Sequence, residues 1–216
     1  MRSLGILGGT FNPPHLGHVA VALSAREELG LERVLLMPAG SPPHKPAGEG
    51  SSDPGASHRL RMCRLAVEGI EGVSACALET ERGGPSYTVD TLRAIHASHP
   101  DAELTFIVGA DIANTLASWR EPAQLLDLAH LAVAARSGTD RQQLLDTVAG
   151  IEPAHADGQP RVSRAQFLTM GTIEVSSSAV RERAARGAPI EGMVGPAVAR
   201  YIAAHDLYRV AAGAVS

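Results

Sequence analysis

The chain has 216 residues, a formal net charge of −4, 44% hydrophobic residues and 19% charged residues. These values are typical of a globular protein and allow one sizeable domain with a real core. The negative charge excludes a nucleic-acid binder held by bulk electrostatics, so an anion site would have to be local. No apolar run approaches the roughly 18 residues of a membrane span, and the Gly-rich N-terminus does not read as a signal peptide. We therefore expect a cytoplasmic protein, with neither membrane nor nucleic acid as a partner.

The beginning of the chain predicts a strand, a loop, a helix and a second strand. Ser3–Leu7 is an apolar run that ends at two glycines, and Arg33–Pro38 is another apolar run. Between them, His18–Leu29 has apolar residues at helical spacing and is closed by Gly30. This succession has the size of a right-handed βαβ unit.

The same alternation continues to the end of the chain. Further strands are expected at Val73–Leu78, Leu104–Val108, Leu131–Ala135 and Phe167–Ile173. Further helices are expected at His58–Ile70, Thr88–Ser98, residues 112–127 with a break at Pro122, Asp140–Val148, Ser176–Arg186 and Pro196–His205. The pattern predicts an α/β fold with a Rossmann-like, doubly wound parallel sheet. We expect one domain over residues 1–216, with a lid-like loop at 39–57 and a C-terminal helical part at 176–209.

Two cysteines, Cys63 and Cys76, fall in an expected helix and an expected strand. Their spacing is not that of metal ligands, and a disulfide is not expected in a reducing compartment. We expect both to be small core residues.

The loop from Gly8 to His18 reads GGTFNPPHLGH and joins the first strand to the first helix. It is neither a G-x-G-x-x-G nor a Walker A loop. Gly8 and Gly9 let a phosphate approach the main chain, and the helix behind them offers N–H donors to an anion. His15 and His18 are three residues apart and share one helix face. They suit a phosphate better than a zinc ion, which would need further ligands.

Three unusual loops, at residues 8–18, 38–46 and 109–111, each follow an expected strand. In a doubly wound sheet, ligands bind at the carboxyl ends of the strands beside a switch point. We therefore expect these loops to converge on one cleft.

The first loop resembles the signature of the H-x-G-H nucleotidyltransferases, which transfer a nucleotidyl group from a triphosphate and release pyrophosphate. Further segments resemble those of bacterial nicotinate-mononucleotide adenylyltransferases in order and spacing: PPHK at Pro42–Lys45, GPSYT at Gly84–Thr88, GAD at Gly109–Asp111 with Trp119 after it, and SSSAVR at Ser176–Arg181. The resemblance runs from about residue 3 to about residue 209. Asn12 and Ser178 stand where close relatives often have Asp and Thr, and both remain polar.

The resemblance implies that AMP passes from ATP to nicotinate mononucleotide, which gives deamido-NAD and pyrophosphate. His15 and His18 would be the catalytic residues and would contact the ATP phosphates. The remaining ATP contacts would be Gly8, Gly9, Phe11, Gly109, Asp111, Ser177, Ser178 and Arg181. The mononucleotide would contact Thr10, His44, Lys45, Tyr87, Thr88 and Trp119. No protein-bound metal is expected, and Mg²⁺ would arrive on the triphosphate, because the sequence has no carboxylate cluster to cage it.

Several of these residues also have ordinary structural interpretations. Ser176–Ser178 can cap a helix that meets phosphates, with Arg181 beside it, or can be a plain cap with a solvated arginine. Asp111 can accept hydrogen bonds from ribose hydroxyls or be an N-cap. Trp119 can stack on a pyridine ring or pack half-buried. Arg59 could help to hold the lid-like loop, but we expect it to be solvated.

Three other functions stay open. Phosphopantetheine adenylyltransferase is disfavoured by the chain length, PPHK, GPSYT and Trp119. A metal-dependent hydrolase would use His15, His18 and Asp111 and would need a bound transition metal. A nucleotide-sensing module without chemistry is disfavoured by the complete histidine pair. The sequence leaves homo-oligomerisation open.

Overall fold

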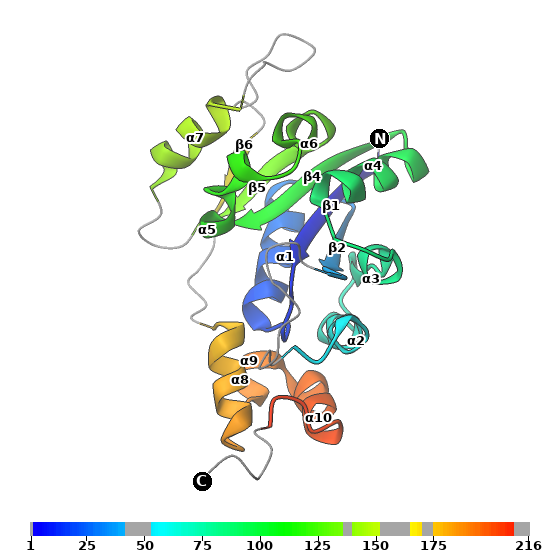
Figure 1. Cartoon of the computed structure of the whole chain (residues 1–216), viewed down its shortest axis with the longest axis vertical. Coiled ribbons are helices and arrows are strands. Elements are labelled where there is room, and N and C mark those ends of the chain that lie inside the picture. Colours follow the sequence, from blue (N-terminus) through cyan, green and yellow to red (C-terminus); the bar gives the residue numbers. More distant parts are fainter. Residues whose placement is uncertain (1, 42–52, 136–139, 152–164, 170–174, 210–216) are drawn as a thin grey trace.

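The computed structural model describes residues 2–41, 53–135, 140–151, 165–169 and 175–209 (Figure 1). A parallel six-stranded sheet has the order β3-β2-β1-β4-β5-β6. Its strands are β1 (Arg2–Gly9), β2 (Arg33–Pro38), β3 (Val73–Ala75), β4 (Ala102–Gly109), β5 (His130–Ala134) and β6 (Ala165–Leu168). This is the doubly wound order, with its switch point between β1 and β4. The predicted α/β fold is confirmed.

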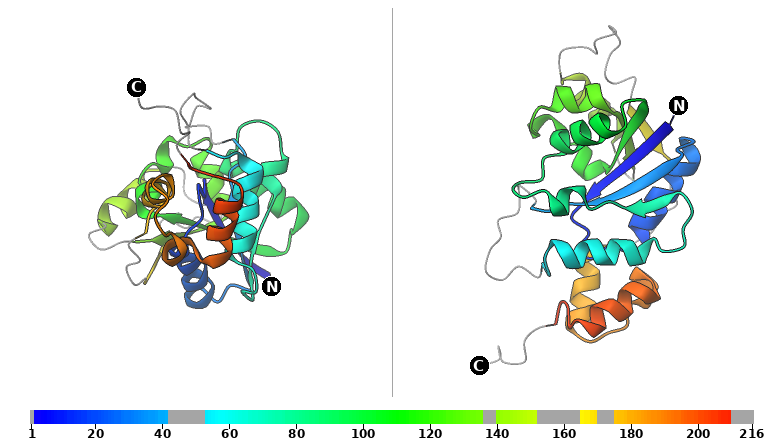
Figure 2. Two further views of the ribbon diagram at one scale, coloured as in Figure 1. Left: turned by 90° about the horizontal axis from the view of Figure 1, so that it is seen from below. Right: turned by 90° about the vertical axis from the view of Figure 1, so that its right-hand side faces the viewer.

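Helices cover both faces of the sheet (Figures 1 and 2). The described part of the chain contains the helices α1 (Leu16–Glu28), α2 (Ala56–Ala66), α3 (Leu78–Glu81), α4 (Thr88–Ser98), α5 (Ala110–Ala113), α6 (Pro122–Leu128), α7 (Arg141–Ala149), α8 (Ser177–Ala185), α9 (Glu191–Val194) and α10 (Pro196–Ala204), with a 3-10 turn η1 (Leu116–Ser118). Buried residues of α1 and α2 pack on one face. Buried residues of α4 to α7 and η1 pack on the other. The strands are therefore apolar on both sides, as parallel strands usually are.

The C-terminal helices α8 to α10 form a third core cluster below the sheet. Met62 of α2 is buried in the same cluster as Val180, Val198 and Ile202, and so packs the C-terminal helices against the rest of the molecule. Figure 2 shows α2 between the sheet and these helices. None of the helices in the described part of the chain is long and apolar enough to span a membrane.

Some boundaries differ from those expected. β3 ends at Ala75 and Leu78 begins α3, because this short edge strand pairs only with β2 before the chain turns. Cys76 therefore follows the strand, packed against the core, whereas Cys63 is buried in α2 as expected. Residues 112–127 are not one interrupted helix but parts of α5, η1 and α6, and Pro122 occupies the favoured first turn of α6.

The bounds of the last strand also differ from those expected. β6 begins at Ala165 and ends at Leu168, whereas the sequence predicts Phe167–Ile173. Residues 170–174 lie outside the described residues, and so do 42–52 of the expected loop at 39–57.

Candidate active site

The first strand leads into a tightly folded loop at the carboxyl edge of the sheet. β1 ends at Gly9, where a Cβ atom would lie 3.2 Å from the ring of Phe11. Phe11 is 2% exposed and has a φ of 51°, in the left-handed region that a bulky residue rarely adopts. Its ring therefore supports the loop from inside.

The two histidines lie together at the start of α1. His15 is the N-cap residue, and its ring stacks on that of His18 with centroids 3.7 Å apart. The Phe11 ring meets His18 edge-on at 4.8 Å. The backbone N–H of His15 donates to Nδ1 of His18 over 3.1 Å. Because Nδ1 is an acceptor, the ring proton of neutral His18 is carried by Nε2, which can donate to a phosphate oxygen.

The start of α8 lies against the same loop. The Ser177 hydroxyl donates to the carbonyl of Pro13 over 2.9 Å, and Arg181 Nη1 donates to the carbonyl of Asn12 over 2.8 Å. A second nitrogen of Arg181 donates to Ser178 Oγ over 3.1 Å. The Ser176 hydroxyl caps α8 by accepting from the Ala179 N–H, which confirms the predicted serine cap. Two helix N-termini, those of α1 and α8, therefore meet at one loop.

On the other side, the loop after β2 is joined to the GPSYT segment. The N–H groups of Gly40 and Ser41 donate to Ser86 Oγ over 2.9 and 3.3 Å, and the Ser86 N–H donates to the Ser41 carbonyl over 2.9 Å. Tyr87 is the N-cap of α4 and Thr88 is its first residue. Pro42–Lys45, including the predicted site residues His44 and Lys45, lies outside the described residues.

A buried carboxyl group supports this segment. Glu79 of α3 is buried and accepts a hydrogen bond of 2.7 Å from the Thr91 hydroxyl of α4. Burial raises the pKa of Glu79, and hydrogen bonds from Thr91 and Ser86 oppose that rise. The main chain of the loop after β2 also passes close to the main chain of α3, because a Cβ atom on Gly40 would lie 2.1 Å from the Glu79 carbonyl oxygen. Glycine is therefore required where the β2 loop passes α3.

The predicted residues after β4 lie at its carboxyl end. Gly109 ends the strand, and Asp111 is exposed in α5. Trp119 is half-buried: its ring meets Phe106 edge-on at 5.9 Å, and its Nε1 donates to Thr115 Oγ1 over 3.0 Å. The Phe106 ring in turn lies where a side chain on Gly8 would be, 3.2 Å from a Cβ atom. Trp119 therefore packs on the core, while its stacking on a pyridine ring stays a prediction.

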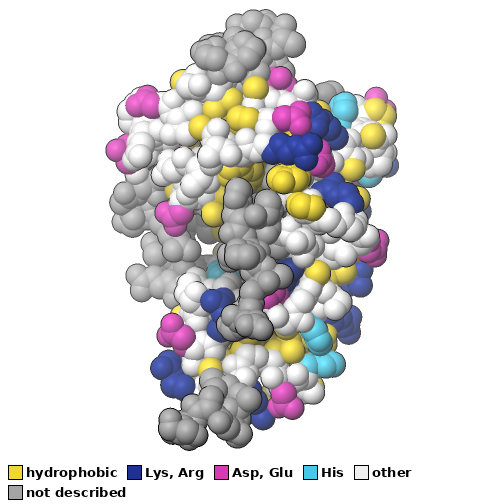
Figure 3. Space-filling model, in the orientation of Figure 1, with side chains coloured by type: hydrophobic (Ala, Val, Ile, Leu, Met, Phe, Trp, Pro, Cys, Tyr) yellow, Lys and Arg dark blue, Asp and Glu magenta, His cyan; other side chains and the backbone are white. Residues whose placement is uncertain are grey.

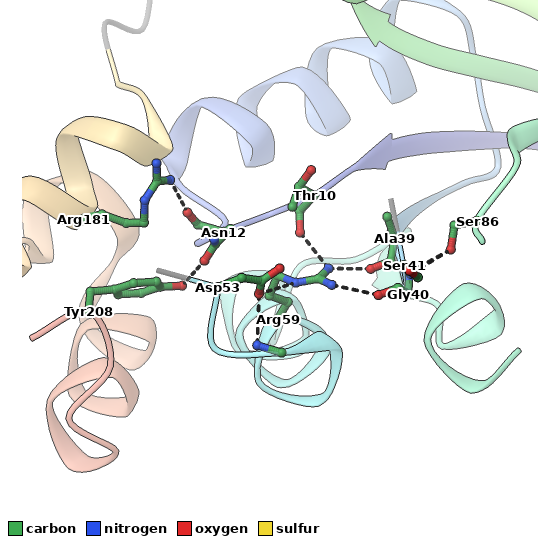
Figure 4. A network of polar contacts seen from close by, with 11 residues as sticks. Thr10, Asn12, Ala39, Gly40, Ser41, Asp53, Arg59, Ser86, Arg181 and Tyr208 are labelled. Atoms are coloured by element: carbon green, nitrogen blue, oxygen red, sulfur yellow. Dashed lines mark hydrogen bonds and ion pairs between the residues drawn. The ribbon is translucent and has the colours of Figure 1, made fainter. Parts of the chain in front are cut away.

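The expectation that Arg59 is solvated is wrong. The side chain is 1% exposed and donates to three backbone carbonyls and to Asp53 (Figure 4). A signal was available in the sequence, because Arg59 precedes Met62 and Cys63 by three and four positions and so shares their buried helix face. The carbonyls that receive its hydrogen bonds come from distant segments and could not be read from that pattern.

The surface near the site carries mixed charge. Arg93 and Arg120 pair with Asp90 and Glu121 over α4 and the start of α6, a patch visible in Figure 3. Arg120 also covers the Tyr87 ring, with its guanidinium carbon 4.7 Å from the centroid. In the described part of the chain, no three His, Cys, Asp or Glu side chains gather as metal ligands. The set that the hydrolase alternative requires, with Asp111 beside the two histidines, is thus not assembled there.

A loop with two imidazoles, bounded by two helix N-termini and an arginine, suits phosphate groups. Together with the doubly wound sheet, it fits the class of nucleotidyltransferases that the first loop resembles. The family model described as cytidylyltransferase-like matches residues 6–183. The chain belongs to this family and, within it, to the nicotinate-nucleotide adenylyltransferases, as its relatives indicate.

Two relatives illustrate the similarity, and both are named probable nicotinate-nucleotide adenylyltransferase. The one from Synechococcus sp. (strain JA-3-3Ab) is 40% identical over 208 residues, which are 96% of this chain and 95% of the relative. The one from Bordetella petrii is 40% identical over 209 residues, 97% of this chain and 100% of the relative. The solved structure of Plasmodium falciparum nicotinic acid mononucleotide adenylyltransferase complexed with NaAD shares the fold, with a TM-score of 0.73 at 18% identity. That comparison covers 96% of this chain and 98% of the other.

Proposed function

We propose that the enzyme transfers the AMP part of ATP to nicotinate mononucleotide, which gives deamido-NAD and pyrophosphate in NAD biosynthesis. The observation that carries the proposal is the loop of residues 10–15, with the stacked histidines and the start of α8 on one side and the β2 loop and GPSYT segment on the other. Such an arrangement offers separate places for two phosphorylated substrates. The names of the relatives supply the identity of those substrates.

The chemistry needs no covalent enzyme intermediate. The phosphate of a mononucleotide is already ionised near pH 7, because its second pKa is about 6. One of its oxygens attacks the α-phosphorus of ATP, and the bond to the β-phosphate oxygen breaks as pyrophosphate leaves in line. No general base is required, so the enzyme acts by positioning two anions and stabilising the charge of the transition state.

On the ATP side, His18 would donate from Nε2 to the α-phosphoryl group, and His15 would contact the phosphates beside it. Gly8, Gly9 and the backbone of Phe11 would line the approach, with the ribose hydroxyls at Gly109 and Asp111. The start of α8 would bind phosphate oxygens through Ser177, Ser178 and Arg181. Mg²⁺ carried by the triphosphate would neutralise its charge, in keeping with the preference of this ion for substrate phosphates and water.

On the mononucleotide side, Thr10, His44 and Lys45 would hold the phosphate. Backbone N–H groups at Tyr87 and Thr88, at the start of α4, would bind the nicotinate carboxylate. Trp119 would stack on the pyridine ring. We further propose that the enzyme works in the cytoplasm, as expected from a sequence without an apolar run of membrane-spanning length.

The test is a turnover assay with purified protein, ATP, Mg²⁺ and either nicotinate or nicotinamide mononucleotide. Dinucleotide and pyrophosphate should appear together, and the nicotinamide analogue should react more slowly, because an amide mispairs the donors of a carboxylate site. Equal or reversed kcat/KM values would overturn the nicotinate preference. Absence of product with both substrates would overturn the proposed reaction.

A further inference from the structure

The buried side chain of Arg59 connects several loops at the carboxyl edge of the sheet. In the first turn of α2, its Nη1 donates to the carbonyls of Thr10, over 2.9 Å, and Ala39. Its Nη2 donates to the Gly40 carbonyl over 3.1 Å, and its Nε to Asp53 Oδ1 over 3.0 Å. Figure 4 shows the guanidinium between these groups.

Stability alone does not explain an ionised group in this place. A guanidinium removed from water loses hydration, and a well-packed apolar side chain in such a position is often as stable or more stable. What an apolar side chain cannot do is bind several carbonyl oxygens at once. The planar guanidinium has five N–H donors in a fixed fork, so it sets the positions of its acceptors relative to one another.

The carbonyls that Arg59 binds come from two neighbouring strand ends. Thr10 directly follows β1, and Ala39 and Gly40 directly follow β2, the strand paired with it. The next residues extend the network, because the N–H groups of Gly40 and Ser41 donate to Ser86 Oγ. The guanidinium is therefore linked to the segment that begins α4.

Arg59 also binds residues on both sides of residues 42–52, the segment that contains Lys45. Gly40 precedes this segment and Asp53 follows it, and both accept hydrogen bonds from the same guanidinium. The Asp53 carboxylate additionally accepts from the Gly55 N–H over 2.9 Å, which fixes it at the start of α2. The Arg59 side chain therefore holds the chain at two positions, just after β2 and just before α2.

We propose that Arg59 is a positioning residue for the mononucleotide: it holds the backbone at Thr10, Ala39 and Gly40 in the arrangement that receives this substrate, without contacting a reacting atom. The inference rests on the proposed function for the identity of the substrate. The structure connects Arg59 to the mononucleotide side through three carbonyls, whereas the ATP side is held by the separate contacts of α8 with Asn12 and Pro13. Loss of Arg59 should therefore affect the two substrates unequally.

The first experiment compares Arg59→Lys and Arg59→Met with the wild type in steady-state kinetics, varying each substrate in turn. We expect KM for nicotinate mononucleotide to rise about tenfold or more and KM for ATP to stay within about twofold. Arg59→Lys should lie between the wild type and Arg59→Met, because an ammonium keeps the charge but lacks the fork. Arg61→Met is the matched control, since Arg61 is exposed on the same helix. It should leave all constants unchanged.

A second variant covers the case in which the Arg59 variants do not fold. Ser86→Ala keeps Arg59 in place and removes the acceptor for the N–H groups of Gly40 and Ser41, together with the hydrogen bond from Ser86 to the Glu79 carboxyl group. It should raise the same KM selectively, by about threefold to tenfold. Wild-type constants in the folded variants, or equal rises in both KM values, would overturn the inference.

Calorimetric titration of nicotinate mononucleotide without ATP separates this inference from the proposed reaction. Mononucleotide binding that is weakened in Arg59→Lys or Ser86→Ala and retained in Arg61→Met supports the positioning role even if no product forms. Binding equal to that of the wild type in all three variants overturns it. A failure of turnover with normal mononucleotide binding would count against the proposed reaction only.

Discussion

The hydroxyl of Tyr208 donates a hydrogen bond of 2.7 Å to the side-chain oxygen of Asn12, across 196 residues of sequence. Arg181 donates to the backbone carbonyl of the same asparagine. Asn12 lies between the glycines that end β1 and the histidines that begin α1. Burial raises the pKa of the Tyr208 hydroxyl, so it remains a protonated donor across the working range of pH. Two donors from the C-terminal part therefore hold the centre of the loop between β1 and α1 (Figure 4).

Replacing Tyr208 with Phe should lower kcat/KM about threefold to tenfold, because it removes one hydrogen bond with a net value of about 1 kcal/mol. The same change should lower the free energy of unfolding by a similar amount. Tyr201→Phe is the control, since its hydroxyl lies 2.9 Å from His58 Nδ1 and away from the loop. Steady-state kinetics and thermal denaturation of both variants test this. Similar losses of activity in the two would contradict a specific role for Tyr208.

His18→Ala should lower kcat by about 10²-fold, the scale of losing one donor to the transition state. Tm should fall only modestly, because the ring is half-buried and the hydrogen bond that its Nδ1 accepts from the His15 N–H is worth about 1 kcal/mol. His58→Ala, on α2, is a control that should keep kcat. If His18→Ala retains kcat within a few-fold, the histidine is structural.

Trp119→Ala should raise KM for the mononucleotide and leave KM for ATP near its wild-type value. Stacking on nucleobases is worth roughly 1–3 kcal/mol per base, and a pyridine ring offers a similar face. The variant should also lose stability, because the edge-on contact with Phe106 contributes about 0.5–1.5 kcal/mol beyond area burial. Trp119→Phe keeps an aromatic face, so it should recover part of the mononucleotide affinity and part of the stability that Trp119→Ala loses. A KM effect confined to ATP would show that Trp119 contacts ATP rather than the mononucleotide.

Lys45→Arg should lower kcat/KM for the mononucleotide about tenfold, near 1.4 kcal/mol. Lys45 is the one lysine among 19 basic residues, so a cation that merely had to be positive would have been Arg at this position too. An ammonium is a compact point charge that can approach one phosphate among crowded groups, whereas a guanidinium needs room for its fork. Lys45→Ala should lower kcat/KM for the mononucleotide further than Lys45→Arg does. Wild-type kinetics in the Arg variant would show that the lone lysine is an accident of composition.

Cys63 should resist thiol reagents in the folded protein, because burial raises its pKa and leaves almost no thiolate to react. Cys76 is only partly buried and should react first. Mass-spectrometric labelling at pH 8 should give one modified thiol under native conditions and two in denaturant. Equal labelling rates at the two sites would contradict the observed packing of α2.

The sequence predicts elements well where periodicity alone decides them. Thr88–Ser98 has apolar residues at 89, 92 and 95 on one face, and the helix has these bounds in the structure. The sequence does not predict where β3 ends. Leu78 continues the apolar run of the strand, but in the structure it is the first residue of α3 and packs on the core from there. Of the residues grouped by the family motifs, those described directly after β1 and β4 lie at the carboxyl edge of the sheet, whereas the expectation of a solvated Arg59 is wrong. Its partners are main-chain oxygens, which have no signature in the sequence.

The contacts at Asn12 also have a consequence for synthesis on the ribosome. Ser177, Arg181 and Tyr208 are made long after β1 and α1, and their helices reach the sheet through packing on Met62 of α2. A nascent chain can form its first βαβ unit early from local contacts. Arg59 can hold the Thr10 carbonyl early, whereas the hydrogen bond to the Asn12 side chain forms only once residue 208 has emerged. The order of synthesis therefore completes the contacts of this loop last, and a chain that stops short of residue 208 lacks the donor to the Asn12 side chain.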